Sequence, residues 1–149
     1  MRSHMRASIS KGRPWGAAQA RIFLERLLPL VPDAPVQVAH FTGAGPGYDD
    51  PPSDEAMGVL ADAVARHDPR TRKLWFDVAS LANGDITQEQ AAKLVARIRQ
   101  VGVAHLLYGS DSALGGNLRP REAWAAFCRL PLAGDELSAI AANVAPWLR

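Results

Sequence analysis

Two side chains that can bind a metal or transfer a proton stand near the ends of predicted strands. Asp111 follows the run Ala104–Ser110 (AHLLYGS), and His40 lies at the end of the run Pro35–Phe41 (PVQVAHF). Short apolar runs of this kind are typical of buried parallel strands. The carboxyl ends of parallel strands are where α/β proteins gather their chemistry. We therefore expect His40 and Asp111 to point into one polar centre at that edge of a sheet.

The chemistry available to such a pair is metal binding and proton transfer. A carboxylate at a strand end can hold a divalent metal or take a proton from water bound to it, and histidine is the common metal ligand and general base. The alternative interpretation of Asp111 is a turn aspartate that caps the following loop. The loop Gly43-Ala44-Gly45 lacks the following Lys-Ser/Thr of a phosphate cradle, so a plain loop is the better interpretation.

Other polar residues have mainly structural interpretations. Asp77 lies inside the predicted strand 73–79, and it either points into a polar centre or bonds to neighbouring backbone or to an Arg. We expect His67 to be a solvated residue at a helix end and His105 to be structural. Cys128 has no base nearby in sequence and is expected to be a small buried side chain.

Strands and helices alternate along the sequence, which predicts an α/β fold with a parallel sheet and right-handed crossovers. Ser53 is the expected N-cap of its helix. Thr87 and Gln90 form a predicted capping box, and Gly102 is the expected end of that helix. Strands are expected at 36–41, 73–79 and 103–109, with a fourth possible at 1–5; helices are expected at 16–31, from about 53 to 67, at 87–101, from 120 and from 135.

Composition bounds the size and class of the protein. The chain has 149 residues, a net charge of +2 and 48% hydrophobic residues, which predicts a single globular domain over residues 1–149. The charges form no basic run, which argues against nucleic acid as a partner. The one cysteine fits a reducing cytoplasm, and no apolar run reaches the length of a membrane span. We therefore expect a cytoplasmic protein with no membrane partner.

Three motifs resemble the C-terminal half of amidohydrolase-related proteins, which are metal-dependent hydrolases and decarboxylases of the amidohydrolase superfamily. They are Val38–Gly43 (VAHFTG), Leu106–Asp111 (LLYGSD) and Asn143–Ala145 (NVA). The Gly-Ser-Asp at the end of the second motif is the most specific part of the resemblance, which extends from about residue 4 to residue 149. It implies an α/β fold made of parallel βα units, the C-terminal half of a TIM-type (β/α)8 barrel.

The resemblance also implies a site. Asp111 resembles the last-strand aspartate that binds the metal or takes a proton from its water, and His40 resembles the sixth-strand histidine. His4 resembles the fifth-strand histidine, which is usually a metal ligand. The implied cofactor is a divalent metal, zinc, and the implied reaction is attack of activated water on an ester, lactone or amide. The sequence departs from the family because no first-strand His-x-His pair occurs in it.

A chain with four of eight strands would leave its barrel open. We therefore expect a fragment, a split gene product, or a protein that forms a homo-oligomer or pairs with a complementing chain. The apolar side chains that face inward, such as Val38, Phe76 and Leu107 or whichever residues of each strand lie on that side, would lack opposing strands, which predicts self-association or marginal stability. Little hydrolase activity is expected from the lone chain. One alternative is a non-catalytic scaffold that keeps the fold. The other is a flavodoxin-like regulatory or nucleotide-binding domain, which explains the alternation of strands and helices but not the Asn143–Ala145 motif.

Overall fold

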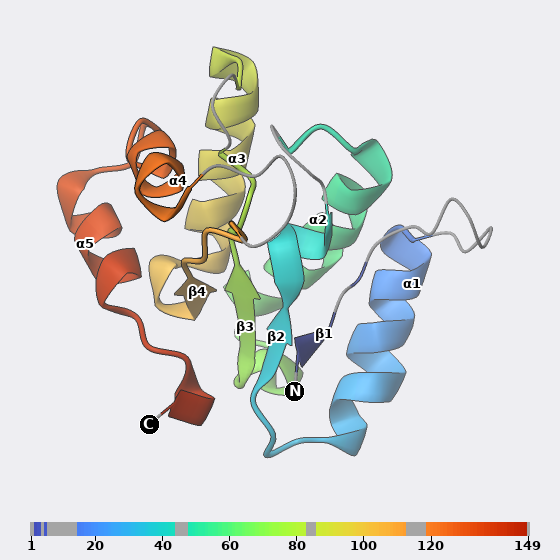
Figure 1. The fold of residues 1–149 in the computed structure, drawn as a ribbon. Helices are drawn as coiled ribbons and strands as arrows, with labels where there is room; N and C mark the ends of the chain where they lie inside the picture. The colour runs from blue at the N-terminus through green and yellow to red at the C-terminus, as the bar shows by residue number, and fades with distance from the viewer. Residues whose placement is uncertain are drawn as a thin grey trace.

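The computed structural model describes residues 2–3, 5, 15–43, 48–82, 86–112 and 119–148. Its four strands form one sheet in the order β1-β2-β3-β4, and every neighbouring pair is parallel (Figure 1). The strands are β1 (Arg2–Ser3), β2 (Val36–Val38), β3 (Leu74–Asp77) and β4 (Leu106–Leu107). The predicted α/β class with a parallel sheet is therefore confirmed.

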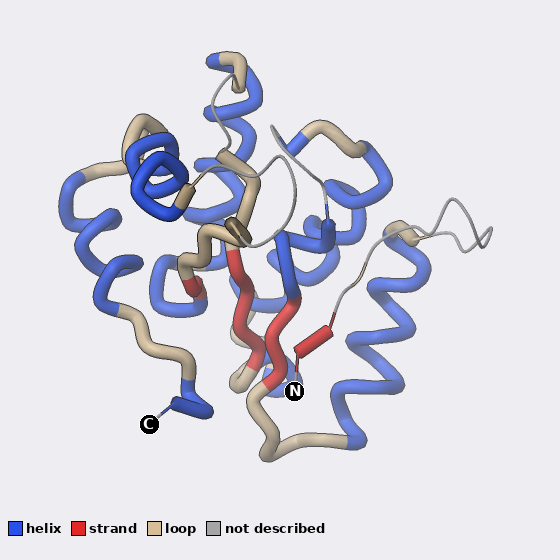
Figure 2. Tube along the Cα trace, in the orientation of Figure 1, coloured by secondary structure: helices blue, strands red, loops and turns tan. Residues whose placement is uncertain are grey.

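Helices connect the strands and surround the sheet. Figure 1 shows α1 beside β1, α2 and α3 following it around the sheet, and α4 and α5 beyond β4, and Figure 2 shows how short the strands are against these helices. Within the described ranges, no helix combines the length and apolar character needed to cross a bilayer. The helices are α1 (Ala17–Ile22), α2 (Pro51–Ala65), α3 (Gln88–Val101), α4 (Pro120–Phe127) and α5 (Gly134–Ala142).

The two faces of the sheet differ in composition. Alternate residues of the strands join a continuous apolar core with the helices, and they are 0–1% exposed: Val36, Val38, Leu74, Phe76 and Leu106. The residues between them face the other way, because successive side chains of a strand point to opposite faces. Gln37, Asp77 and Leu107 line a cavity on that second face. Of the three residues named as candidates for the inward face, Val38 and Phe76 face the helices and Leu107 faces the cavity.

The strands are shorter than predicted because the backbone turns early. β2 ends at Val38, and His40, Phe41 and Thr42 follow in left-handed conformation with φ of 51°, 43° and 69°. Residues Val103–His105, which were expected to open the last strand, form a 3₁₀ turn. A left-handed residue cannot continue a pleated strand, so the apolar pattern overstates the length of the strands.

Helix ends follow the sequence in part. The capping box is confirmed: the Gln90 backbone N–H donates to Thr87 Oγ1 at 3.2 Å, and the Thr87 N–H donates to Gln90 Oε1 at 2.8 Å. Gly102 ends α3 with a φ of 85°, as expected. The N-cap of α2 is Asp50, and Ser53 donates its hydroxyl to the Asp50 carboxylate. Ser53 is therefore not the cap, because Pro51 and Pro52 already occupy the first helical positions.

Two further expectations concern single residues. Cys128 is exposed, so its expected burial is wrong. It follows Phe127 at the end of α4 and faces away from the core that Phe127 joins. His105 has its Nδ1 2.9 Å from the carbonyl oxygen of Leu74, which fits the structural role expected for it.

The predicted helix 16–31 is α-helical only over Ala17–Ile22 and continues as a π turn and a 3₁₀ turn.

Candidate functional site

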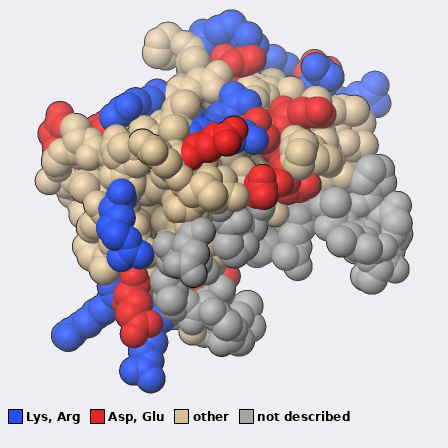
Figure 3. Space-filling view, turned by 90° about the horizontal axis from the view of Figure 1, so that it is seen from above, with Lys and Arg blue, Asp and Glu red and all other residues tan. Residues whose placement is uncertain are grey.

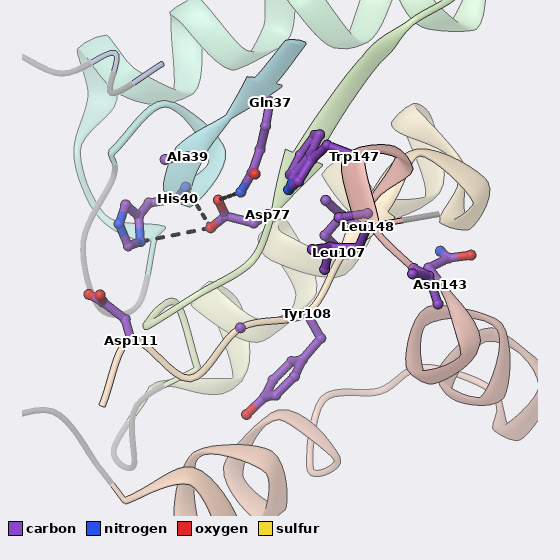
Figure 4. A pocket seen from close by; sticks show the side chains of 13 residues that line it. Gln37, Ala39, His40, Asp77, Leu107, Tyr108, Asp111, Asn143, Trp147 and Leu148 are labelled. Atoms are coloured by element: carbon purple, nitrogen blue, oxygen red, sulfur yellow. Dashed lines mark hydrogen bonds and ion pairs between the residues drawn. The ribbon is translucent and has the colours of Figure 1, made fainter. Parts of the chain in front are cut away.

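A cavity of about 550 Å³ opens on the second face of the sheet and along the carboxyl ends of its strands. Its polar lining includes His40, Asp77 and Asp111, and its apolar lining includes Leu107 and Trp147 (Figure 4). His40 follows β2 and Asp111 follows β4, so the two predicted site residues come from strands on either side of β3. The structure thus brings His40 and Asp111 to one cavity.

Hydrogen bonds to the end of β3 position His40. Its backbone N–H donates to Asp77 Oδ1 at 3.0 Å, and its ring Nδ1 lies 2.9 Å from the carbonyl oxygen of Ala79. A carbonyl oxygen only accepts, so the hydrogen of this bond lies on Nδ1. The neutral ring then carries its lone pair on Nε2, the atom that accepts a proton or binds a metal.

Asp77 is the buried acceptor that holds this edge together. Its Oδ1 also accepts the Ala79 backbone N–H at 3.2 Å, and its Oδ2 accepts from the side-chain amide of Gln37. The carboxylate is 6% exposed, and these donors offset the cost of burying its charge. Asp77 therefore ties β3 to β2 through neighbouring backbone and Gln37. Asp77 thus bonds to neighbouring backbone and also points into a polar centre, because it lines the cavity.

Asp111 is held from the same segment of β3. The Ser80 hydroxyl donates to Asp111 Oδ2 at 3.0 Å. Ser80 and Asp111 both have left-handed backbone, with φ of 62° and 50°, a conformation that aspartate tolerates better than most residues. Asp111 is thus a turn residue and a cavity residue at once. The stretch Asp77–Ser80 positions both predicted site residues, His40 through Asp77 and Ala79, and Asp111 through Ser80.

The C-terminal segment forms the apolar part of the cavity wall. The Asn143 side-chain amide donates to the carbonyl oxygens of Val103 and Leu106 at 2.7 and 2.8 Å. These bonds fix the chain after α5 against β4 and bring Trp147 and Leu148 to the cavity. Asn143 belongs to the third of the motifs named above, but no structural contact was expected of it. Its place directly after the last helix, where a polar side chain can reach a neighbouring backbone, was the available signal.

Tyr108 lines the cavity but is not a good acid or base for it. Burial raises the pKa of its hydroxyl. In Figure 4 its ring points away from His40 and Asp111, and it packs on the rings of Trp124 and Phe127 at centroid distances of 4.7 and 5.4 Å. Tyr108 therefore anchors the end of β4 to α4.

His40 and Asp111 are suitable zinc ligands by type, but they are fewer than the three protein ligands of a catalytic zinc. Imidazole nitrogen and carboxylate oxygen are both zinc ligands, and a catalytic zinc uses three protein ligands. Within the described ranges, no three His, Cys, Asp or Glu side chains gather closely enough to hold a metal ion. His4, the third predicted ligand, lies outside the described residues. A zinc ion at this edge therefore needs a ligand beyond His40 and Asp111.

Charges elsewhere are mixed in sign. Figure 3, which views the molecule from above, shows acidic and basic side chains interspersed among the described residues of that face.

Comparisons of this chain with family models, curated proteins and solved structures return no match. The relationship to amidohydrolase-related proteins is accordingly a prediction from the three sequence motifs.

Proposed function

We propose that this chain carries part of the active site of a metal-dependent hydrolase similar to amidohydrolase-related proteins. The observation that carries the proposal is the convergence of His40 and Asp111 on one cavity at the carboxyl ends of parallel strands. The Gly-Ser-Asp end of the last strand and the motif around His40 support it from the sequence. In this proposal the parallel sheet is the C-terminal half of a TIM-type barrel.

His40 and Asp111 are the residues that would hold the metal, with His4 as a third candidate. A zinc ion, when bound there, would activate water for attack on an ester, lactone or amide carbonyl. Asp111 supplies an anionic oxygen beside the reacting centre and can accept a proton. His40 presents Nε2, because Ala79 holds the hydrogen on Nδ1. Asp77 positions His40 and takes no direct part in the reaction.

A second chain completes the site in this proposal. A second copy or a complementing half-barrel would supply the ligand that His40 and Asp111 lack, together with an opposing wall that excludes water. The exposed thiol of Cys128 fits the reducing cytoplasm that we propose as its location. The substrate is a small molecule, because a cavity of about 550 Å³ matches the size of small-molecule sites.

The test is metal-dependent turnover of ester, lactone and amide substrates by the full chain and by Asp111→Asn. Asn keeps the shape of the side chain but removes its charge and its basic oxygen, so we expect the variant to lose at least about 100-fold in any metal-dependent rate. Asp33→Asn is the matched control, because Asp33 is 82% exposed and pairs with Arg72 away from the cavity.

The lone chain is expected to turn over slowly, so the assay is repeated at increasing protein concentration. A rate that rises more steeply than the protein concentration supports completion of the site by a second copy. Equal turnover by the wild type and Asp111→Asn removes Asp111 from the mechanism. Absence of metal-dependent turnover at every concentration contradicts completion by a second copy and favours a non-catalytic scaffold or a different complementing chain.

A further inference from the structure

The cavity has a polar end and an apolar wall. His40, Asp77 and Asp111 lie at the carboxyl ends of the strands, whereas Leu107 and Trp147 lie along the inner face and the C-terminal segment (Figure 4). Small-molecule sites typically combine a mostly apolar lining with a few polar groups that fix orientation. This arrangement suits a ligand with one polar group and one apolar substituent.

The apolar wall is partly exposed to solvent. Val144, Trp147 and Leu148 line the cavity and are 43%, 38% and 74% exposed. Large apolar side chains that gather on an exposed surface generally mark a binding site. A ligand substituent that lies against Trp147 and Leu148 would remove this apolar surface from water.

The wall is also fixed in place. Asn143 ties the start of the segment to β4 with two hydrogen bonds, and the Leu148 N–H donates to the Ala145 carbonyl at 2.9 Å, closing the last turn. A preformed surface loses little freedom when a ligand binds, so Trp147 and Leu148 can contribute to affinity.

The charge of the lining bears on the ligand's charge. Among the described residues that line the cavity, Asp77 and Asp111 are acidic and none is Lys or Arg. Asp77 is compensated by the donors of His40, Ala79 and Gln37, but no basic side chain of this described lining would pair with an anionic ligand. With no metal bound, a carboxylate ligand would lose its hydration without gaining an ion pair from this described lining.

We propose that the metal-free cavity binds neutral carbonyl compounds with an aromatic or bulky alkyl substituent, and that Trp147 and Leu148 determine the preference for that substituent. The carbonyl group lies toward His40 and Asp111, and the substituent lies against the C-terminal segment. The inference rests on the proposed function for the assignment of this cavity as the substrate site, and it adds the class of substrate.

The test is direct binding of three probes to the full chain by ligand-detected NMR, without added metal. The probes are 2-phenylacetamide, which is neutral and aromatic, phenylacetate, which differs in charge, and acetamide, which lacks the ring. We expect 2-phenylacetamide to bind about tenfold more tightly than either of the others. Tighter or equal binding of phenylacetate overturns the neutral preference, and equal binding of acetamide overturns the role of the apolar wall.

Matched variants locate the binding. Leu148→Ala and Leu30→Ala remove the same side chain from positions that are 74% and 75% exposed, but only Leu148 lines the cavity. We expect Leu148→Ala and Trp147→Ala to weaken 2-phenylacetamide binding about threefold and tenfold, and Leu30→Ala to leave it unchanged. Equal affinities for all variants contradict the proposal.

The outcomes separate this inference from the proposed function. Selective binding of 2-phenylacetamide without metal-dependent turnover supports the ligand class and counts against the hydrolase. Metal-dependent turnover of small aliphatic substrates at rates equal to those of aromatic ones supports the hydrolase and overturns the ligand class.

Discussion

The two faces of the sheet are built from neighbouring residues of the same strands and yet are held by different forces. On the helix-covered face, Val38, Phe76 and Leu106 are fully buried among apolar side chains. On the cavity face, Gln37 and Asp77 are almost as well buried but are polar and depend on hydrogen bonds. The first face is stabilised by apolar contact, whereas on the second face hydrogen bonds offset the cost of buried polar groups.

The backbone is left-handed at several residues, both beside the cavity and in the apolar core. His40 and Asp111 line the cavity and Ser80 donates to Asp111; all three have left-handed backbone, as do Phe41 and Tyr48 of the core. Such conformations cost about 1–2 kcal/mol for residues with a Cβ, and clusters of them are typical of functional sites. Bonds from Asp77 and Ser80 hold His40 and Asp111 in place. The helix-covered face therefore stabilises the fold by apolar contact, whereas hydrogen bonds on the cavity face hold polar groups in a fixed arrangement.

The largest expected difference between the faces comes from two adjacent leucines of β4. Leu106 is 0% exposed within the core, and Leu107 is 7% exposed beside the cavity. We expect Leu106→Ala to lower the free energy of unfolding by about 3–5 kcal/mol and Leu107→Ala by about 1–2 kcal/mol, because Leu107 already adjoins empty space. Urea unfolding measures both. Equal losses would show that the faces do not differ in this way.

Asp77 should be the most important polar residue for stability. Asp77→Ala leaves the buried N–H groups of His40 and Ala79 without their acceptor, and we expect a loss of about 2–4 kcal/mol in unfolding free energy. Asp77→Asn retains one oxygen and should lose less. Chemical denaturation of both variants checks the order. A stable Asp77→Ala variant would contradict the role of Asp77 as the link between β2 and β3.

Charge pairs on the helix side should give a smaller, pH-dependent effect. Arg97 of α3 donates to Asp54 of α2 at 2.8 Å. Burial raises the pKa of Asp54, but the hydrogen bond and charge of Arg97, aided by Lys93, outweigh it and hold that pKa below its usual value. A lowered pKa contributes stability above the ordinary carboxyl pKa of about 4, and that contribution disappears as the pH falls through the lowered pKa.

We therefore expect Asp54→Asn to lower the unfolding free energy by about 1–2 kcal/mol at pH 7 and by progressively less below pH about 4. Unfolding curves recorded across this pH range make the measurement. Asp33→Asn is the control, because the Asp33–Arg72 pair is exposed and should contribute little. If the difference in unfolding free energy between Asp54→Asn and the wild type grew as the pH fell, the lowered pKa of Asp54 would be contradicted.

The smallest effect compares two left-handed histidines, His40 at the cavity and His67 after α2, with φ of 51° and 55°. His67 is exposed, so His67→Gly should stabilise the protein by about 0.5–1 kcal/mol by relieving the backbone. His40→Gly relieves the same strain but removes the Nδ1 bond to Ala79, so we expect no gain. Thermal melts compare the two. An equal gain at both positions would show that the hydrogen bond of His40 contributes nothing.

Local signals in the sequence predicted part of this molecule. The alternation of strands and helices, the Thr87 capping box and the Gly102 helix end depend on residues close in sequence, and each is confirmed. The meeting of His40 and Asp111 follows from the general rule that parallel strands end at one edge. Which alternate residues face the helices could not be read, because a period of two is symmetric between the faces.

Contacts between distant residues could not be predicted. The left-handed turn at His40 depends on Asp77, which lies 37 residues further along the chain. Asn143 likewise donates to the carbonyl oxygens of Val103 and Leu106, which are distant in sequence and close only in the folded chain. Cys128 looked like a core residue because the apolar pattern of α4 is short and marks its buried side poorly. Long-range hydrogen bonds thus decide where the strands stop and how the candidate site is positioned.

If His40 and Asp111 bind one divalent metal together, zinc titration by calorimetry will detect it. The variants are Asp111→Asn, His40→Asn, chosen because Asn tolerates left-handed backbone, and the control Asp33→Asn. We predict that the wild type and the control bind zinc equally and that both site variants lose about tenfold or more in affinity. Zinc affinity that is the same in all four proteins, or undetectable in the wild type at every protein concentration, would contradict the account.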